Sequence, residues 1–458
     1  GLNEFAVRFP SAFFGVLTVL LTYFLVKKIF INSKSANLYA IASSLILGVS
    51  HWHIMLSRAA FEANVATFFI ILGVFLFLVG IQDKKWVLIL SLVSFVISLY
   101  TFNTARIVSP ILLLLLLISF RREVLNIKRE AIISMIIAFF LLLPALNFFL
   151  SPQASLRFRE VNIFSDIGVI ESTNERIVND NNVWWSRIVN NRRFAYGVEY
   201  LKHYFDNLSP SFLFIKGDGN PKFSTQDVGQ LYLWDLPFFV IGILYLIRKK
   251  EGYWWLIPLW LILALSPSAT ARETPHALRI ETALPTFQIL VAYGFVTFIN
   301  FFKKYKFRIS LFLLLFLFLN VLYFLHGYSV HYAREFSGEW QYGYKESIDY
   351  VKSVEGEYDE IRVTNKLGRP YIYYLFYTKT KPSDFRKTAI VNRNPFGFVN
   401  VNGFSKYRYS ESIGTLKSKT RNILYIDVPS RIPSKVEVLK RFYLLNGEEV
   451  LAAYRYSI

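Results

Sequence analysis

Ten apolar runs cross this chain, and every second loop between them is rich in lysine and arginine. The five basic loops together hold sixteen Lys/Arg against four Asp/Glu, and they lie at residues 27–35, 83–85, 121–130, 248–251 and 303–308. A bias of short loops toward Lys and Arg sets membrane orientation, so we expect these five loops to face the cytoplasm. The loops between them then lie on the other side of the membrane. They carry Trp, His, Pro, Asn, Glu and single arginines, which are residue types of a polar reaction site.

The composition supports a polytopic membrane protein. Of 458 residues, 54% are hydrophobic and 18% aromatic, which is rare in a soluble domain. The formal charge of +19 does not indicate a nucleic-acid partner, because the cytoplasmic loops alone account for +12 of it. Anionic lipid headgroups are the natural partners of those loops. The chain has no cysteine, which excludes disulfides and thiolate metal sites.

A helix needs about 20 apolar residues to cross a bilayer. The predicted spans are 10–30, 36–50, 63–81, 86–100, 107–119, 131–150, 231–247, 253–268, 280–302 and 309–326. The runs 86–100 and 107–119 are short and are also consistent with one broken hairpin. The charge alternation favours two separate spans, since Lys85 and Arg121 must lie on the same side.

The domain organisation follows from a change of pattern along the chain. Residues 1–328 are expected to form a transmembrane domain with about ten spans and a long outer loop, 151–230. In the tail, 329–458, alternating runs at 359–364 and 422–428 predict strands, and 343–354 predicts an amphipathic helix. The expected fold class is an α-helical polytopic membrane protein with a C-terminal, extracytoplasmic α/β soluble domain.

Two of the predicted outer segments carry candidate phosphate ligands. Arg58 and Glu62 are four residues apart, so on one helix they would share a face. We interpret them as a phosphate-binding arginine beside a functional acid, because charge at the mouth of a membrane helix is costly; an interfacial ion pair is the alternative. Arg106 opens another span from the outer side, where its guanidinium suits a phosphate or serves only as a topological anchor.

A third outer segment, residues 272–279, holds Arg272, His276 and Arg279. Pro275 predicts the first turn of a helix, which would place His276 and Arg279 one turn apart at an anion-binding N-terminus. The alternative is a loop tied down by Arg–Glu pairs.

A fourth outer segment contains Asp218 and Asn220, with Gln230 further along. Its Gly-Asp-Gly-Asn-Pro sequence first indicates a tight turn, and it is also suited to orienting sugar hydroxyls or a cation. No EF-hand loop, P-loop or HExxH sequence occurs in the chain. The four segments together indicate an anionic ligand with a hydroxyl-rich portion, and the apolar body offers a place for a long lipid tail. A lipid-linked phosphosugar meets both requirements.

Five short stretches resemble a known family. They are GLNEFAVRFPSA (1–12), LSRAAFEAN (56–64), FIKGDGNP (214–221), GQLYLWDLP (229–237) and PHALR (275–279). In order and topology they are similar to the bacterial dolichyl-phosphate-mannose-protein mannosyltransferase-like glycosyltransferases of the GT-C superfamily. The resemblance implies a multi-pass enzyme of the plasma (inner) membrane. Such an enzyme transfers a sugar from a polyprenyl-phosphate donor to a protein, lipid or glycan acceptor on the extracytoplasmic face.

The resemblance also implies roles for particular residues. Glu62 matches the family's second acidic position, and His276 and Arg279 match donor-side residues. The family's principal catalytic acid precedes the Arg-Phe-Pro-Ser region, residues 8–11 here. Because the chain starts with Gly1 on the outer side, we expect this to be a fragment that lacks at least one upstream helix and that acid.

The resulting assignments divide the candidates by role. Glu62 is expected to be catalytic; Arg58, Arg106, Arg272, His276 and Arg279 to bind the donor phosphate; and Asp218, Asn220 and Gln230 to bind substrate. A divalent cation is left open as a cofactor. The expected partners are a polyprenyl-phosphate sugar, the lipid bilayer and the acceptor, without nucleic acid. The alternatives are a lipid-linked glycan polymerase or ligase, a transporter or flippase, and a catalytically silent scaffold whose outer domain binds glycans.

Overall fold

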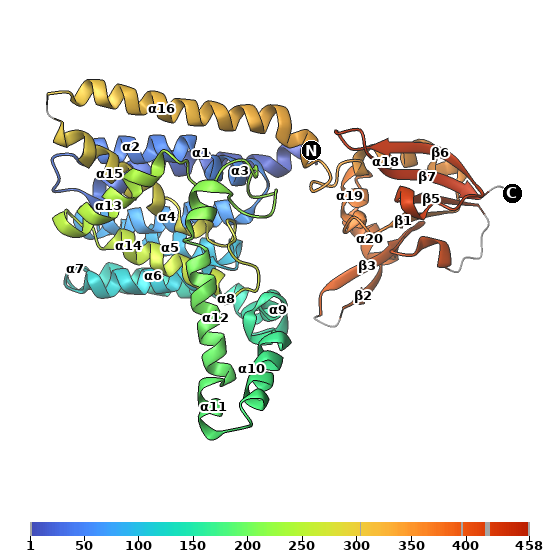
Figure 1. Ribbon diagram of the computed structural model, residues 1–458, viewed down its shortest axis with the longest axis horizontal. Helices are drawn as coiled ribbons and strands as arrows, with labels where there is room; N and C mark the ends of the chain where they lie inside the picture. Colours follow the sequence, from blue (N-terminus) through green and yellow to red (C-terminus); the bar gives the residue numbers. More distant parts are fainter. Residues whose placement is uncertain (1, 303, 395–396, 417–421, 457–458) are drawn as a thin grey trace. The chain divides into compact units, whose positions relative to one another are not determined.

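The computed structural model describes residues 2–302, 304–394, 397–416 and 422–456, and it divides into two compact units. One unit is Val7–Leu325, and the other is His326–Ile458 together with Gly1–Ala6. The first is helical and the second contains the sheet, as Figure 1 shows. This arrangement confirms the predicted fold class, a helical membrane domain followed by an α/β domain, and the extracytoplasmic placement of that domain stays a prediction.

The helical unit contains every one of the ten apolar runs as a helix or part of one. In chain order its helices are α1 (Glu4–Ile29), α2 (Ala36–Val49), α3 (His51–Arg58), α4 (Glu62–Gln82), α5 (Val87–Thr101), α6 (Ala105–Ser119), α7 (Arg121–Asn126), α8 (Lys128–Phe149), α9 (Pro152–Val161), α10 (Ile167–Asn179), α11 (Trp184–Val189), α12 (Arg192–Asp206), α13 (Asp235–Lys249), α14 (Leu256–Ala269), α15 (Thr286–Phe301) and α16 (Lys306–His326). Three short helical turns are η1 (Ile163–Ser165), η2 (Ser211–Ile215) and η3 (Glu281–Ala283).

Not all of these helices are long enough to cross a membrane unaided. Within the described residues, five are both long and apolar enough: Glu4–Ile29, Glu62–Gln82, Lys128–Phe149, Glu281–Phe301 and Lys306–Glu335. A sixth arises if α2 and α3, which meet at a bend of 56°, are counted as one span. Helices α5, α6 and α14 are apolar but shorter. The chain is thus a multi-pass membrane protein, and the count of ten spans stays a prediction.

Two local predictions of helix geometry are wrong. Arg58 ends α3 and Glu62 begins α4, so the two side chains do not share a helix face. Ala59 takes an extended conformation between them, and this breaks the helix. Pro275 does not start a helix either, because residues 275–280 form turns before η3.

Helix α15 is the central helix of this unit, with 94% of its most apolar window buried. It packs closely against α13 through two glycines. A Cβ atom at Gly294 would lie 1.9 Å from the Phe238 carbonyl oxygen, and one at Gly242 would lie 2.0 Å from that of Leu290. Small residues of this kind let helix backbones approach one another within a membrane.

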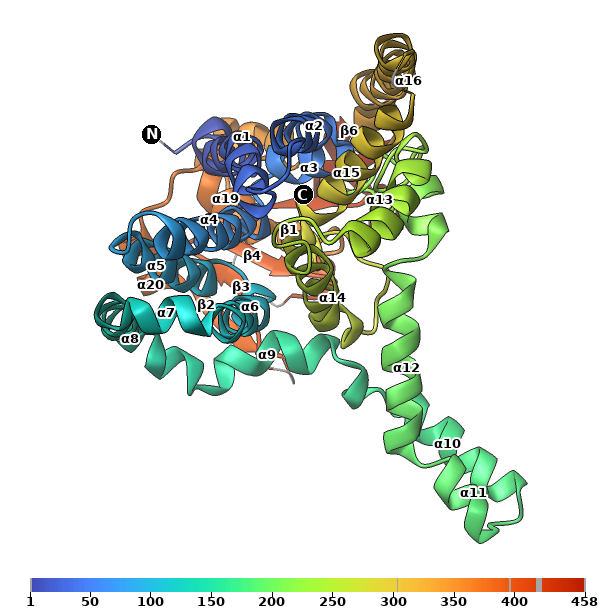
Figure 2. The same cartoon turned by 90° about the vertical axis from the view of Figure 1, so that its left-hand side faces the viewer.

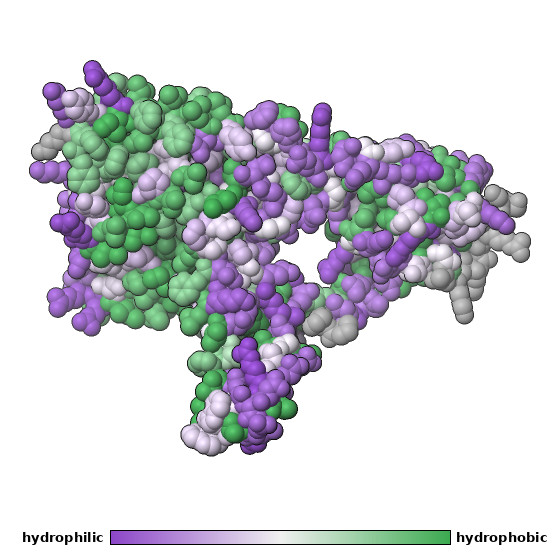
Figure 3. All heavy atoms as spheres, viewed as in Figure 1, coloured by the Kyte–Doolittle hydropathy of each residue, from purple (hydrophilic) through white to green (hydrophobic). Residues whose placement is uncertain are grey.

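The surface of the helical unit matches a membrane environment. Figure 3 shows a hydrophobic area over the sides of the long helices, between hydrophilic residues at the two ends of the bundle. In contrast, α10, α11 and α12 run across the direction of α1, α15 and α16, as Figures 1 and 2 both show. The side chain of Tyr204 connects α12 to α14, because its hydroxyl donates a hydrogen bond to the Ile262 carbonyl at 3.0 Å.

The second unit is an α/β domain with a seven-stranded sheet in the order β2-β3-β4-β1-β5-β7-β6. Its elements are η4 (Gly327–Tyr332), α17 (Ala333–Glu335), α18 (Tyr344–Val354), η5 (Glu355–Glu357), β1 (Glu360–Thr364), α19 (Pro370–Tyr377), α20 (Pro382–Thr388), β2 (Ile390–Arg393), β3 (Val399–Phe404), β4 (Tyr407–Ser410), η6 (Ile413–Thr415), β5 (Ile423–Asp427), η7 (Pro429–Arg431), β6 (Val436–Tyr443) and β7 (Glu449–Tyr456). The predicted strands near 359–364 and 422–428 are β1 and β5, and the predicted helix is α18.

The central strand of this sheet, β1, is parallel to both of its neighbours, β4 and β5. The remaining pairs are antiparallel. The larger core lies on one face of the sheet, where Ile348 of α18 and Tyr374 of α19 pack against Val363 and Ile426. Alternation along the strands directs these side chains to one face, and a smaller cluster with Ile423, Tyr425 and Tyr454 lies on the other.

Candidate active site

A cavity of about 830 Å³ lies in the helical unit, and three of the four predicted polar segments contribute to it. Glu62 comes from the start of α4, Arg106 from the start of α6, and His276 and Arg279 from the turns before η3. These segments are far apart in the sequence. Each lies at the end of an apolar helix, and the packing of these helices brings the segments together.

Two arginines that the sequence analysis missed also line this cavity. Arg157 and Arg159 lie on α9, which begins with Pro152 at its first turn. An isolated bridge between Asn162 and Ala271 joins the end of α9 to the residue before Arg272. The usable signal was the Arg-Phe-Arg sequence in an outer loop, where arginines oppose the positive-inside rule.

The lining of this cavity is strongly cationic. Four arginines line it together with Glu62, the single acidic side chain among the described residues of the lining. Two of these arginines are paired with acids outside the lining, Arg157 with Glu160 and Arg279 with Glu273. Glu62 is exposed to the cavity and lies in the first turn of α4, where the helix dipole favours a negative charge. The arrangement therefore suits an anion beside a carboxylate.

Arg106 stands at the junction with a second, apolar cavity. Its Nε donates to the Leu99 carbonyl at 3.3 Å, and its guanidinium lies 5.1 and 5.5 Å from the ring centres of Phe148 and Phe149. Arg106 and Phe149 also line the neighbouring cavity of about 370 Å³. The other residues that line it are apolar: Leu99, Phe139, Leu142, Leu143 and Leu146.

His276 is held in a mostly buried position. Its backbone N–H donates to Asn207 Oδ1 at 3.1 Å, and its ring packs against Phe223 with centroids 4.9 Å apart. Burial, with the nearby Arg279 and Arg157 acting in the same direction, lowers the pKa of His276 to about 3. The imidazole is therefore neutral at physiological pH, and its 3.8 Å approach to Asp218 is not an ion pair.

Arg279 is positioned by Glu273. Its guanidinium donates to the Glu273 carbonyl oxygen at 2.7 Å and lies 3.4 Å from the Glu273 carboxylate. Burial lowers the pKa of Arg279 from its ordinary value, with partial compensation from Glu273. Such a small decrease leaves a guanidinium charged at neutral pH.

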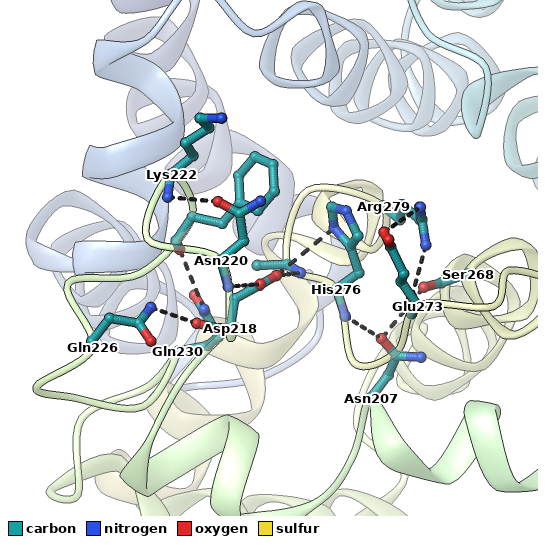
Figure 4. Close-up of polar contacts among 12 residues, drawn as sticks. Asn207, Asp218, Asn220, Lys222, Gln226, Gln230, Ser268, Glu273, His276 and Arg279 are labelled. Carbon is teal, nitrogen blue, oxygen red and sulfur yellow. Dashed lines mark hydrogen bonds and ion pairs between the residues drawn. The ribbon is translucent and has the colours of Figure 1, made fainter. Parts of the chain in front are cut away.

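Asp218 does not line the cavity and instead connects two loops. Its carboxylate accepts hydrogen bonds from the Ala277 N–H at 2.6 Å and from the Asn220 N–H at 2.8 Å (Figure 4). Burial raises the pKa of Asp218, while these two donors lower it. Asp218 thus fixes the turn that carries His276.

The remaining predicted ligands also lie outside the cavity lining. Asn220 accepts from the Lys222 N–H, and Gln230 is buried and donates to the Phe223 carbonyl at 3.3 Å. Arg272 donates to the Glu160 carbonyl at 2.6 Å, and Arg58 ends α3 on an exposed surface. Asn220, Gln230 and Arg272 hydrogen-bond to backbone groups of the loops around the cavity, and these bonds hold their side chains outside its lining. Within the described residues, no group of three or more His, Cys, Asp or Glu is arranged to hold a metal ion.

Comparison with known proteins identifies two similarities. Residues 1–148 match the family model described as dolichyl-phosphate-mannose-protein mannosyltransferase. Comparison of the sequence with curated proteins finds no match. The fold is similar to that of ArnT from Cupriavidus metallidurans in two crystal structures, the apo state and the state bound to undecaprenyl phosphate.

The likeness to ArnT extends over nearly the whole chain. The TM-scores are 0.52 and 0.51 at 10% and 11% sequence identity, and each alignment covers 99% of this chain and 84% of ArnT. At this identity the likeness concerns the fold. It agrees with the resemblance seen in the sequence: residues 1–148 match the mannosyltransferase family model, and the fold is similar to that of ArnT over nearly the whole chain.

Proposed function

We propose that this protein is a glycosyltransferase that moves a sugar from a polyprenyl-phosphate donor to an acceptor at the extracytoplasmic face of the membrane. The observation that carries the proposal is the cationic cavity that shares Arg106 and Phe149 with an apolar cavity. A lipid phosphate has these two parts in the same order, a charged head and a hydrocarbon tail. The family match and the undecaprenyl phosphate bound to ArnT support the same donor class.

The phosphate is bound by the arginines of the larger cavity. Arg106, Arg157 and Arg279 present guanidiniums, whose planar forks bind phosphate oxygens in pairs. Negative charge grows on the phosphate as the sugar leaves. Fixed cations in a partly buried site therefore stabilise the transition state more than the ground state.

The lipid tail occupies the apolar cavity between α5, α6 and α8. Its leucine and phenylalanine side chains offer no hydrogen bonds, which suits a polyprenyl chain. Because Arg106 borders both cavities, the tail's first units would lie close to the bound phosphate.

Glu62, which the resemblance matches to the family's second acidic position rather than to its principal acid, serves the acceptor in this mechanism. Its carboxylate accepts the proton of the acceptor hydroxyl as that oxygen attacks the sugar's anomeric carbon. The bond between this carbon and the phosphate oxygen breaks, and the polyprenyl phosphate leaves with the electron pair. Asp218 and Asn207 act indirectly, since they position the His276 turn.

Binding of polyprenyl phosphate to the purified full chain tests the donor site. We expect Arg279→Ala and Arg157→Ala to weaken binding about 10- to 100-fold each, the loss expected for a hydrogen bond to a charged group. Arg187→Ala is the matched control, because Arg187 is exposed on α11 and does not line the cavity. Equal affinity in all three variants and the wild type would place the donor elsewhere.

The number of phosphates on the donor lipid distinguishes the proposed transferase from the alternative, a glycan polymerase or ligase. Four lining arginines are enough for either one or two phosphates. Polyprenyl monophosphate and diphosphate should therefore be compared as competitors of radiolabelled sugar transfer. Stronger competition by the monophosphate supports the proposal, and stronger competition by the diphosphate supports a polymerase or ligase.

A further inference from the structure

The C-terminal α/β domain has a polar cavity of its own. It has a volume of about 200 Å³ and lies at the carboxyl end of β1, the strand that is parallel to both β4 and β5. In α/β sheets, ligands commonly bind outside the carboxyl ends of the parallel strands. The position alone therefore makes the side chains around this cavity of interest.

Amide and aromatic side chains dominate the lining of this cavity. The amides are those of Asn365, Asn400 and Asn402, and the aromatic rings are those of Tyr371 and Tyr409. Arg369 adds a guanidinium. These residues come from the end of β1, the start of α19, β3 and β4. No acidic residue is among the described residues that line it. The lining thus offers both hydrogen-bond donors and acceptors, with a single cation and two aromatic rings.

Strand register places three of these residues on one face of the sheet. Val363 pairs with Tyr409, and Asn365 follows two residues later on the same face. On the other side of β4, Gly403 pairs with Arg408, so Asn402 is opposite Tyr409. The register of β3 against β2 shifts at Asn402, and Asn400 lies beyond this shift, opposite Asn392. The grouping of Asn365, Asn402 and Tyr409 is therefore built by the sheet itself and does not depend on a single loop.

The polar groups of this cavity lack partners among the described residues. Tyr409 is only 3% exposed, and its hydroxyl is buried without a hydrogen bond to any described residue. Buried polar atoms in folded proteins are nearly always hydrogen-bonded, so an orphaned hydroxyl beside a cavity indicates a missing partner. Asn365, Asn400 and Asn402 likewise use their side-chain amides in no hydrogen bond within the described part of the chain.

We propose that this cavity binds one sugar ring of a glycan. Sugar hydroxyls both donate and accept, as side-chain amides do, and the partly exposed ring of Tyr371 offers apolar surface to the C–H face of a pyranose. The volume suits a single ring, and Arg369 at the start of α19 also admits a carboxylate-bearing sugar. The site goes beyond the proposed function, because it gives the C-terminal domain its own contact with the hydroxyl-rich chemistry of the substrate.

Saturation-transfer NMR on the full chain tests this site. The protein is placed in lipid nanodiscs, because detergents with sugar headgroups would compete. The probes are free hexoses, N-acetylhexosamines, hexuronic acids and their methyl glycosides. We expect saturation transfer to at least one of these sugars in the wild type.

Three variants assign the signal to the cavity. Asn400→Ala combined with Asn402→Ala should weaken binding at least tenfold, and Tyr409→Phe should weaken it about three- to tenfold, because each removed group donates or accepts a neutral hydrogen bond. Asn392→Ala is the matched control, since Asn392 lies opposite Asn400 on β2 but does not line the cavity. Tyr409→Phe removes only a hydroxyl without a partner in the described structure, so the fold should be retained.

Two results would overturn the proposal. One is that no sugar of the panel receives saturation. The other is that the double asparagine variant binds as tightly as the wild type. The donor-site variant Arg279→Ala separates this proposal from the function above, because it should lose polyprenyl phosphate and keep the sugar signal.

Discussion

Glu62 owes its proposed role to its position in a cavity that arginines line. It is an exposed carboxylate at the first turn of α4, within a lining that includes Arg106, Arg157 and Arg279. A carboxylate within reach of the acceptor hydroxyl can accept its proton as the sugar is transferred. Removal of this charge should affect turnover more than donor binding.

We expect Glu62→Gln to lower the rate of sugar transfer about 10²- to 10⁴-fold, the usual contribution of a positioned base. The affinity for polyprenyl phosphate should stay the same or increase, because a negative charge near the phosphate is removed. Glu171→Gln is the control, since Glu171 is exposed on α10. A rate for Glu62→Gln within a factor of two of the control would remove Glu62 from the mechanism.

His276 should make the folded protein less stable in mild acid. Its pKa is lowered from 6.5 to about 3 by burial and by two arginines, so below pH 6.5 the unfolded chain binds a proton that the folded chain does not. Stability therefore decreases as the pH falls from 6.5 toward 3, by about 2 kcal/mol between pH 7 and pH 5 for this group.

The measurement is the unfolding temperature of the purified protein at pH 7 and pH 5. His276→Gln keeps a neutral polar side chain at every pH, so the variant should lose less stability on acidification than the wild type. Asp218, whose raised pKa acts in the opposite direction, is present in both proteins and its effect largely cancels. Identical acid-induced shifts in the two proteins would contradict a buried, neutral His276.

At the scale of elements, the crossing of α13 and α15 depends on two glycines. A Cβ at Gly294 would overlap the Phe238 carbonyl, which is backbone and cannot rotate away. The two helices would have to separate, and overpacking of this kind costs about 1–3 kcal/mol.

We therefore expect Gly294→Ala to lower the unfolding temperature of the purified protein. Gly197→Ala on α12 is a matched control, because no atom lies within 4 Å of a Cβ placed there. At that site alanine should be neutral or stabilising, by up to about 1 kcal/mol, through its helix propensity. An unchanged unfolding temperature for Gly294→Ala would show that the helices are not in such close contact.

The sequence predicted elements better than their junctions. Each apolar run forms a helix because burial and lipid both favour apolar side chains along its length. In contrast, the break at Ala59 between α3 and α4 lies inside a continuous helical pattern, and it arises from packing that periodicity does not record. The same holds for Pro275, where the Ala277 N–H is held by Asp218, 59 residues away.

At the scale of the whole molecule, the sequence indicated which segments would supply the site but not their final contacts. Glu62, Arg106, His276 and Arg279 were expected together because their loops share a predicted side of the membrane, and all four line one cavity. Arg157 and Arg159 were missed because they join the cavity through a long-range pairing, that of Asn162 with Ala271. Their roles in binding, like those of the others, depend on the binding experiments above.

The absence of cysteine allows the orientation of the whole chain to be measured without altering other residues. Arg122 lies in a predicted cytoplasmic loop, Gln153 follows on the opposite side, and Ser383 belongs to the α/β domain; all three are exposed. In intact cells, a membrane-impermeant maleimide should label Gln153→Cys and Ser383→Cys but not Arg122→Cys. Permeabilised cells, in which all three should react, control for reactivity. Labelling of Arg122→Cys from outside, with Gln153→Cys protected, would invert the orientation derived from the basic loops and place the cationic cavity on the cytoplasmic side, where the proposed extracytoplasmic transfer could not occur.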